Sequence, residues 1–280
     1  MIYAYAKLDR TGLGNMLFPW ARSEVYRYDM SCAALAPAWT QWARIGPWLR
    51  GEKDKRLYRN VFSNKGYVAG LRKSVLLATR RRIHESDPSA GRPLDADGCI
   101  VQFRGMEKMF QPFASRRALV QQRIHEATRS WILQTVSAEW PTNRSYIGVH
   151  LRRGDFEPWD PSRTRGSLMS MRLPSEWFVK AIQRARSLIG RDVEALVFTD
   201  CRGEDLDVLL REPNTRLAAD APALCHLFAL ANARAIVCSA SSFSMWSAFL
   251  SDAPAIWFPG VAVPPRPAPA VDIVDAFGVA

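Results

Sequence analysis

A short apolar run that ends abruptly in charge most constrains the fold of this chain. Residues 146–151 read Tyr-Ile-Gly-Val-His-Leu, which is typical of a strand packed on both faces. Arg152, Arg153 and Asp155 follow directly, and such side chains are almost never buried without a partner. We therefore predict that this strand ends at the carboxyl edge of a parallel sheet, where open α/β folds bind ligands. The Arg pair could hold an anion such as a phosphate, or it could simply lie at the surface.

The sequence after this run alternates between strand and helix patterns. Strands are predicted at 194–199, 235–238 and 255–258, and helices at 174–190, 206–210, 222–233 and 243–250. Such alternation predicts a parallel, doubly wound sheet with helices on both faces. The second half of the chain is therefore expected to be a Rossmann-like domain.

The amino-terminal half begins with a predicted strand, a Gly-rich turn and a helix, at residues 2–6, 9–15 and 16–28. Glycines such as Gly12 and Gly14 let the backbone approach a ligand, and a helix amino terminus favours an anion. The alternative is an ordinary tight turn between a strand and a helix. This turn is therefore a candidate binding element.

A domain boundary is expected near the middle of the chain. A long helix is predicted at residues 114–136, and Pro141 interrupts the pattern soon afterwards. We therefore expect an amino-terminal α/β domain at 1–140, a second domain at 141–259, and a Pro/Ala-rich tail at 260–280.

Charge and cysteine content bear on partners and compartment. The 38 Lys and Arg exceed the 27 Asp and Glu by 11, which favours an anionic partner such as a nucleotide sugar, an acidic glycan, a membrane surface or a nucleic acid. No nucleic-acid-binding motif is found in the sequence. The five cysteines are widely spaced and form no Cys-x-x-Cys pair, which predicts a reducing compartment rather than a disulfide framework or a zinc site. Neither a signal-peptide pattern nor an apolar run of membrane-spanning length is found, so a cytoplasmic location is expected.

A basic amphipathic stretch occupies residues 68–83. Its cations are Arg72, Lys73, Arg80, Arg81 and Arg82. One interpretation is a helix that lies on the anionic inner face of a membrane, and the other is a solvated helical face.

Four motifs, in order along the chain, resemble those of the α1,2- and α1,6-fucosyltransferase superfamily. His-x-Arg-Arg-x-Asp at 150–155 resembles its first motif. Gly-Leu-Gly-Asn at 12–15 is similar to the amino-terminal motif of the α1,2-fucosyltransferases. Val-Phe-Thr-Asp at 197–200 resembles their Phe-Ser-Asp-Asp segment, and Ser-Ser-Phe-Ser-Met-Trp at 241–246 resembles their Asn-Ser-Ser-Phe-Ser-Trp-Trp segment. The set favours the α1,2 branch, glycosyltransferase family 11.

The resemblance implies a GT-B-like α/β fold, in which two Rossmann-like domains face a cleft. The first domain would be the acceptor side, and the second would bind the nucleotide sugar. The implied activity is inverting transfer of fucose from GDP-fucose to a glycan hydroxyl, with an α1,2 linkage, in bacterial surface polysaccharide synthesis. Two alternatives stay open: a transferase of the same fold with another donor or acceptor, and a non-catalytic nucleotide- or polyanion-binding protein.

Site roles follow from this resemblance and from the charge that a departing nucleoside diphosphate acquires. The catalytic candidates are His150, Arg152 and Asp155, and the base could be Asp155, Glu157, Asp160 or His150. The donor-binding candidates are Gly12, Gly14, Asn15, Arg152, Arg153, Asp200, Ser241, Ser242 and Phe243. Fixed positive charge and a helix amino terminus would neutralise the diphosphate, so no metal cofactor is expected.

Two short matches have the Asp-x-Asp spacing of a metal site. They are Asp95-Ala-Asp97 in a predicted loop and Asp205-Leu-Asp207 in a predicted helix. Because such short matches are common by chance, we interpret both as structural.

Overall fold

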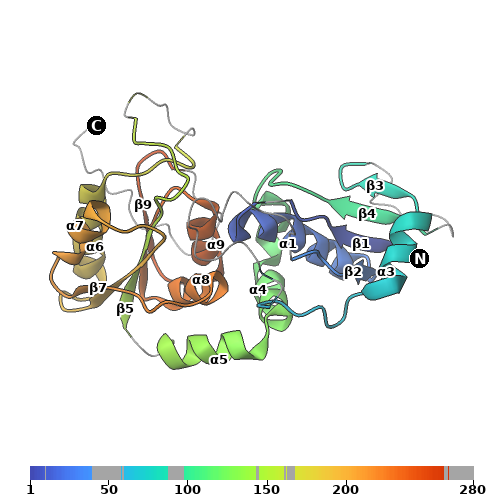
Figure 1. Cartoon of the computed structure of the whole chain (residues 1–280), viewed down its shortest axis with the longest axis horizontal. Helices are drawn as coiled ribbons and strands as arrows, with labels where there is room; N and C mark the ends of the chain where they lie inside the picture. Colours follow the sequence, from blue (N-terminus) through green and yellow to red (C-terminus); the bar gives the residue numbers. More distant parts are fainter. Residues whose placement is uncertain are drawn as a thin grey trace. The chain divides into compact units, whose positions relative to one another are not determined.

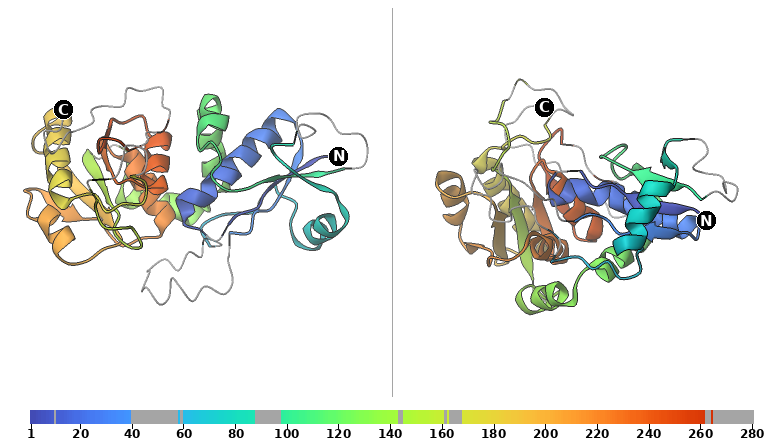
Figure 2. Two further views of the ribbon diagram at one scale, coloured as in Figure 1. Left: turned by 90° about the horizontal axis from the view of Figure 1, so that it is seen from above. Right: turned by 45° about the vertical axis from the view of Figure 1, so that its right-hand side comes forward.

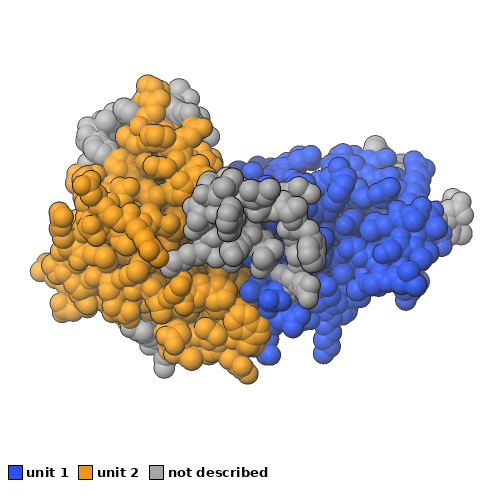
Figure 3. Space-filling model, viewed as in Figure 1, with its two compact units in different colours: residues 1–47, 55–130 blue, residues 48–54, 131–280 orange. Residues whose placement is uncertain are grey.

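The computed structural model describes residues 1–9, 11–39, 58, 60–87, 98–142, 145–160, 162, 168–261 and 264. Within these residues the chain divides into two compact units (Figures 1 and 3), with residues up to 130 in unit 1 and residues from 131 onward in unit 2. The division falls at the start of helix α5 (Ser130–Glu139), whereas the sequence placed it after residue 140.

Helix α5 belongs to unit 2 because its contacts are made there. The thiol of Cys225 lies 4.0 Å from the carbonyl oxygen of Ile132. The side-chain amide of Asn232 donates a 3.3 Å hydrogen bond to the carbonyl oxygen of Trp140, which directly follows the helix. These polar contacts tie both ends of α5 to helix α8 (Ala223–Asn232).

Unit 1 is built on a four-stranded parallel sheet in the order β2-β1-β4-β3. Its strands are β1 (Tyr3–Ala6), β2 (Ala33–Leu35), β3 (Arg82–His84) and β4 (Ile100–Phe103). Its helices are α1 (Leu13–Asp29), α3 (Gly70–Thr79), the 3-10 helix η2 (Gln111–Arg116) and α4 (Arg117–Ala127). The unit is therefore a layered α/β structure.

The sheet of unit 1 buries apolar side chains on both faces. One face includes Ala4, Val101 and Phe103 and packs against Tyr26 of α1. The other includes Tyr5 and packs against α3, which supplies Leu76 and Leu77. Figure 2 shows α1 and α3 on opposite faces of this sheet.

Unit 2 contains a five-stranded parallel sheet in the order β7-β6-β5-β8-β9. The strands are β5 (Tyr146–Leu151), β6 (Glu194–Thr199), β7 (Thr215–Leu217), β8 (Ala235–Cys238) and β9 (Ala255–Trp257). The helices besides α5 and α8 are α6 (Ser175–Ile189), α7 (Glu204–Leu210) and α9 (Ser242–Leu250). The predicted parallel, doubly wound sheet is confirmed.

Strand β5 occupies the centre of this sheet, and all six of its residues are buried. Helices α6 and α7 cover one face, while α8 and α9 cover the other (Figure 1). The direction of strand order reverses between β5 and β8. Strands β6 and β7 extend the sheet on one side of β5, and strands β8 and β9 extend it on the other side. Such a switch point opens a crevice at the carboxyl ends of the two strands.

Helix α6 illustrates how the sequence sets these elements. Its buried residues include Trp177, Phe178, Ala181 and Ile182, which recur at helical spacing and form one apolar face. Pro174 occupies its amino-terminal cap, and Gly190, at φ 130°, occupies its carboxyl-terminal cap. A positive φ of this kind favours glycine, so the sequence encodes both ends of the helix.

Two segments differ from the predicted elements. The helix predicted at 114–136 is divided into α4 and α5, because the backbone of Thr128 is extended and forms an isolated bridge with Phe62. The basic stretch 68–83 contains α3 followed by the edge strand β3. Among the described residues, no helix has the length and apolar character needed to cross a bilayer.

Candidate functional site

Arg152 lies where β5 ends, at the switch point of the unit 2 sheet. Its backbone N–H donates to the hydroxyl of Ser239, which follows β8, at 2.9 Å. Its guanidinium contacts Asp200 at 2.7 Å and Asp155 at 2.8 Å. The side chain remains 27% exposed. Arg152 is therefore a partly exposed cation whose side chain is fixed by two carboxylates. It lies at the switch point, where open α/β sheets bind ligands.

Arg153 is turned in a different direction and is buried, with 4% exposure. Its guanidinium donates to Ser175 at 2.8 Å and pairs with Asp205 at 3.0 Å, at the starts of α6 and α7. Burial tends to raise the pKa of Asp205, but the hydrogen bond from Ser175 and the charge of Arg153 outweigh it and lower the pKa. The two arginines of the motif therefore occupy different surroundings.

Asp200, which follows β6, joins the two arginines. One of its oxygens accepts the backbone N–H of Arg153 at 2.9 Å, and the other contacts the Arg152 guanidinium. A Cβ added at Gly154 would lie 2.2 Å from that second oxygen. Glycine is therefore needed at 154 for the Asp200 carboxylate to reach Arg152. Nucleotide binding by Asp200 stays a prediction, and the contacts in this structure show that its carboxylate positions both arginines.

His150 is buried inside the same edge. Its Nδ1 lies 2.7 Å from the hydroxyl of Ser244, and the ring of Phe243 lies 4.9 Å away. Burial, together with the nearby charge of Arg152, lowers the pKa of His150 to about 3. The imidazole is therefore neutral near pH 7, and its backbone carbonyl accepts a 2.6 Å hydrogen bond from Ser239.

Helix α9 begins beside these groups. Ser241 caps it, because its hydroxyl accepts the backbone N–H of Ser244 at 3.1 Å. Ser242 and Phe243, in the first turn, are partly exposed. A helix amino terminus presents backbone N–H groups and positive potential, so it is a suitable seat for a phosphate.

Three carboxylates follow Arg152 along the chain. Asp155 is 38% exposed and forms the ion pair with Arg152. Glu157 is exposed, and Asp160 accepts hydrogen bonds from the backbone and hydroxyl of Ser162. Asp155 thus directly contacts the candidate anion-binding cation.

The Gly-rich turn lies in unit 1, at the carboxyl edge of its own sheet. Gly12 is the amino-terminal cap of α1, and no side chain caps this helix. The backbone N–H of Leu13 donates to the hydroxyl of Tyr58 at 3.2 Å. Gly14 is buried and Asn15 is partly exposed. The candidates of unit 2 are brought together around β5 and β8, while these three belong to a separate structural element.

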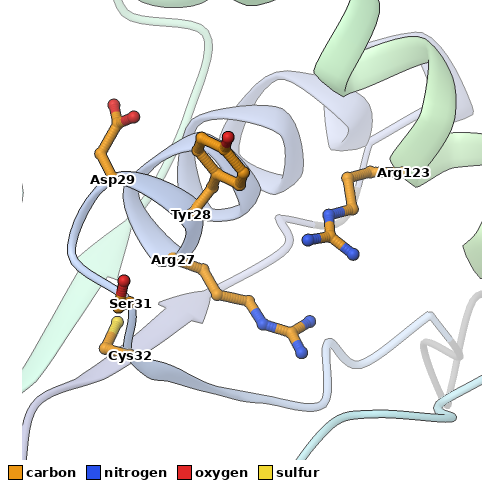
Figure 4. A pocket seen from close by; sticks show the side chains of 6 residues that line it. All are labelled: Arg27, Tyr28, Asp29, Ser31, Cys32 and Arg123. Carbon is orange, nitrogen blue, oxygen red and sulfur yellow. The ribbon is translucent and has the colours of Figure 1, made fainter.

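A cavity of unit 1 lies away from these residues. It has a volume of about 540 Å³ and is lined by Arg27, Tyr28, Asp29, Ser31, Cys32 and Arg123. Figure 4 shows the guanidinium groups of Arg27 and Arg123 approaching one another and the Asp29 carboxylate pointing away. It lies at the carboxyl end of α1, a 17-residue helix, so it is about 25 Å from Gly12 at the other end. This cavity contains none of the predicted site residues.

A smaller cavity of about 300 Å³ lies in unit 2, beside Arg153. It is lined by Arg153, Pro158, Trp159, Arg172, Leu173, Pro174, Ser175, Glu176 and Asp205. It therefore adjoins the candidate site at the start of α6.

The two Asp-x-Asp matches found in the sequence lie in different parts of the chain. Asp205 pairs with Arg153, and Asp207 lies with it in the first turn of α7. Asp95 and Asp97 lie outside the described residues. Among the residues that the structure describes, no cluster of His, Cys, Asp and Glu side chains is suited to a metal ion.

Several polar residues at this edge were not singled out in the sequence. Ser239 joins β5 to β8, Ser244 contacts His150, and Ser175 bridges Arg153 and Asp205. Ser239 and Ser244 could have been suggested by their place in the Ser-rich segment after β8. Ser175 gives no local signal, because its partner lies 30 residues away.

Solved structures of fucosyltransferases are similar to this chain. The fucosyltransferase NodZ from Bradyrhizobium gives a TM-score of 0.57 at 16% identity, covering 90% of this chain and 94% of the other. NodZ α1,6-fucosyltransferase soaked with GDP-fucose gives 0.53 at 15% identity, with coverage of 90% and 94%. POFUT1 in complex with GDP gives 0.50 at 11% identity, with coverage of 90% and 95%.

No protein-family model matches the sequence, and no curated protein sequence matches it. At these identities the structural similarity establishes the fold. The chain has the GT-B-like α/β fold of these fucosyltransferases, with a parallel sheet in each unit.

Proposed function

We propose that this chain is an inverting glycosyltransferase that moves fucose from GDP-fucose to a glycan hydroxyl. The observation that carries the proposal is Arg152, held between two carboxylates yet partly exposed, where β5 and β8 diverge. The fold supports it, since similar structures include NodZ soaked with GDP-fucose and POFUT1 with GDP. The four sequence motifs that resemble the α1,2-fucosyltransferases favour an α1,2 linkage.

Charge neutralisation would be the main chemical contribution of the site. When the bond between sugar and diphosphate breaks, negative charge develops on the departing GDP. The Arg152 guanidinium can form two parallel hydrogen bonds to phosphate, and the first turn of α9 can add backbone N–H groups. These fixed donors stabilise the departing group without rearranging during the reaction. The proposal therefore requires no metal ion for turnover.

The positions of the remaining residues suggest a division of roles. Asp200 would orient Arg152, and Arg153 would join the loop after β5 to α6 and α7 through Ser175 and Asp205. Because His150 is buried and neutral, it would support the loop that leads into α9 rather than accept the acceptor proton.

Asp155 is our first candidate for the base, because it follows Arg152 in the same loop and contacts the guanidinium that we propose binds phosphate. Glu157 and Asp160 are the alternatives. The variants Asp155→Asn, Glu157→Gln and Asp160→Asn distinguish them: the base variant abolishes the rise of kcat with pH, whereas the other two retain it.

The biological setting is part of the proposal. Transfer of fucose to a bacterial surface polysaccharide would take place in the cytoplasm, where the donor is made and where free cysteines stay reduced. Within the described residues the five cysteines are thiols rather than disulfides, which supports that part of the proposal.

Sugar-nucleotide turnover in EDTA tests the activity. The protein is incubated separately with GDP-fucose, GDP-mannose and UDP-galactose, with and without oligosaccharides that can accept fucose. The nucleoside diphosphate released, GDP or UDP, is measured. We expect release of GDP from GDP-fucose in the absence of metal, accelerated by an acceptor. Release from UDP-galactose alone would indicate another donor. GDP binding without any turnover would contradict the enzymatic proposal and favour a nucleotide-binding protein.

A further inference from the structure

Helix α3 of unit 1 carries apolar side chains toward the sheet and also away from it. Leu76 is buried against the sheet, whereas Leu71 is 82% exposed and Val75 is 50% exposed. Leu71, Val75 and Ala78 are spaced at i, i+4 and i+7, so they form one stripe along the outer face. Single exposed apolar residues are ordinary, but an aligned stripe on an amphipathic helix indicates a contact surface.

The segment that carries this stripe is strongly basic. Residues 60–84 contain six Lys or Arg residues and no Asp or Glu. Arg72, Arg81 and Arg82 are exposed, and none of them forms an ion pair with another described residue. The apolar stripe is therefore flanked by cations that are available to an external anion.

Lys73 does not belong to this surface. Its ammonium group donates to the carbonyl oxygen of Ala36 at 2.6 Å and lies 5.1 Å from the ring of Tyr5. Burial lowers the pKa of Lys73, as expected for an ammonium group removed from water. Lys73 thus attaches α3 to unit 1, while the arginines face outward.

We propose that α3 docks this protein onto an anionic lipid bilayer. The stripe of Leu71, Val75 and Ala78 would enter the headgroup region, and Arg72, Arg81 and Arg82 would contact lipid phosphates. A helix of ten residues is about 15 Å long, so it can lie in the membrane plane and cannot cross it. Exposed apolar side chains beside cations fit a bilayer better than a nucleic acid, which would use only the charges. The proposal does not depend on the transferase activity.

Co-sedimentation with vesicles tests this surface. Vesicles of phosphatidylcholine alone are compared with vesicles in which about one third of the lipid is phosphatidylglycerol, at about 0.1 M salt. The stripe variant carries Leu71→Ser and Val75→Ser. Its matched control carries Leu188→Ser and Leu217→Ser, two leucines of unit 2 that are 40% and 47% exposed.

A second pair of variants tests the charges. One carries Arg72→Gln, Arg81→Gln and Arg82→Gln. Its matched control carries Arg184→Gln, Arg191→Gln and Arg211→Gln, which change the net charge equally at exposed positions of unit 2. Thermal denaturation of all four variants verifies folding, and either pair tests the proposal if the other pair fails to fold.

We expect wild-type protein to bind the anionic vesicles and not those of phosphatidylcholine alone. The stripe variant should bind on the order of tenfold more weakly because apolar burial is lost. Each arginine replaced should lower the affinity for anionic vesicles about fivefold, and higher salt should weaken binding further. Both controls should bind like the wild type. The proposal would be overturned if wild-type protein did not bind anionic vesicles, or if the variants and their controls lost vesicle affinity equally. Full retention by the stripe variant, with loss in the arginine variant, would also overturn it in favour of a polyanion site.

Discussion

The two sheets of this molecule use arginine at their carboxyl edges in opposite ways. In unit 1, Arg22 is 4% exposed and reaches both oxygens of Glu85, after β3, at 2.7 and 2.9 Å. It also donates to the carbonyl oxygens of Arg104 and Gly105, after β4, at 2.6 and 3.1 Å. The guanidinium of Arg22 therefore donates its hydrogen bonds to two loops of its own unit and joins them.

In unit 2, Arg152 contacts two carboxylates and remains partly open to solvent. Its neighbour Arg153 performs the joining role, toward Ser175 and Asp205. The comparison shows that position at a sheet edge is not enough to make an arginine a candidate for ligand binding. Arg152 differs from Arg22 and Arg153 in that its guanidinium contacts nearby acceptors and still remains partly exposed to solvent.

Removing Arg22 should have the largest effect on stability. Arg22→Ala leaves the Glu85 carboxylate with little exposure and without its partner, and losses of this kind are about 3–5 kcal/mol in the free energy of unfolding. Arg216→Ala, which removes an exposed partner of Glu194, should cost at most about 1 kcal/mol. Chemical denaturation measures both. Equal costs would contradict the structural role given to Arg22.

Gly154→Ala tests whether Asp200 is held as tightly as the contacts indicate. The new methyl group would meet the Asp200 carboxylate, so that carboxylate must move away from Arg152. We expect a loss of about 1–3 kcal/mol in the free energy of unfolding. Gly12→Ala is the stability control, because a Cβ there meets no atom within 4 Å. If Gly154→Ala is as mild as Gly12→Ala, the Asp200 contact is not restrictive.

Protonation of His150 should make stability depend on pH. The pKa of His150 is lowered to about 3 in the folded state, while an unfolded His titrates near its ordinary value of about 6.5. Between these values the unfolded state binds more protons, so stability falls as pH decreases below about 6.5. From pH 7 to 5 the loss due to this residue is about 2 kcal/mol.

His150→Gln should remove that part of the pH dependence. His125→Gln, at an exposed position of α4, should retain it. The check is to measure the free energy of unfolding at several pH values for the wild type and both variants. A slope that is identical in the wild type and His150→Gln would contradict the neutral, buried state.

Ser241→Ala should have the smallest effect of the four. The loss of its bond to the Ser244 N–H removes the cap of α9, which is usually worth about 1 kcal/mol. Ser187→Ala, on the exposed face of α6, should change the free energy of unfolding by less than about 0.5 kcal/mol. Thermal melting distinguishes the two. If Ser241→Ala is neutral, the hydroxyl does not support the start of α9.

Local patterns were sufficient to predict much of unit 2. Strands β5 and β6 occupy the predicted residues, because a run of six buried residues in β5 and four in β6 gives a strong apolar signal. Short edge elements were missed: β3 and β7 are three residues long, and β7 is mostly exposed. Their strand character comes from neighbours in the sheet, which local sequence does not contain. The same limit explains the division of α4 from α5 at Thr128, whose partner Phe62 is distant in sequence.

The site was predictable as a neighbourhood but not as a set of contacts. The strand-end position of Arg152 and Arg153 followed from the burst of charge after an apolar run. The direction of each guanidinium did not, because it depends on Asp200, Ser175 and Asp205, which lie 22 to 52 residues away. A pattern identifies the residues at an edge, whereas packing selects which of them stays exposed.

Calorimetric titration of GDP in EDTA tests the central claim most directly, with wild-type protein, Arg152→Ala and the control Arg184→Ala, an exposed position on α6. Loss of a charge-assisted interaction with phosphate is worth about 1.5–3 kcal/mol, so Arg152→Ala should bind GDP about 10- to 100-fold more weakly. The control should bind like the wild type, and all three proteins should melt at similar temperatures. GDP affinity that is unchanged in Arg152→Ala, or absent in the wild type, would contradict the account.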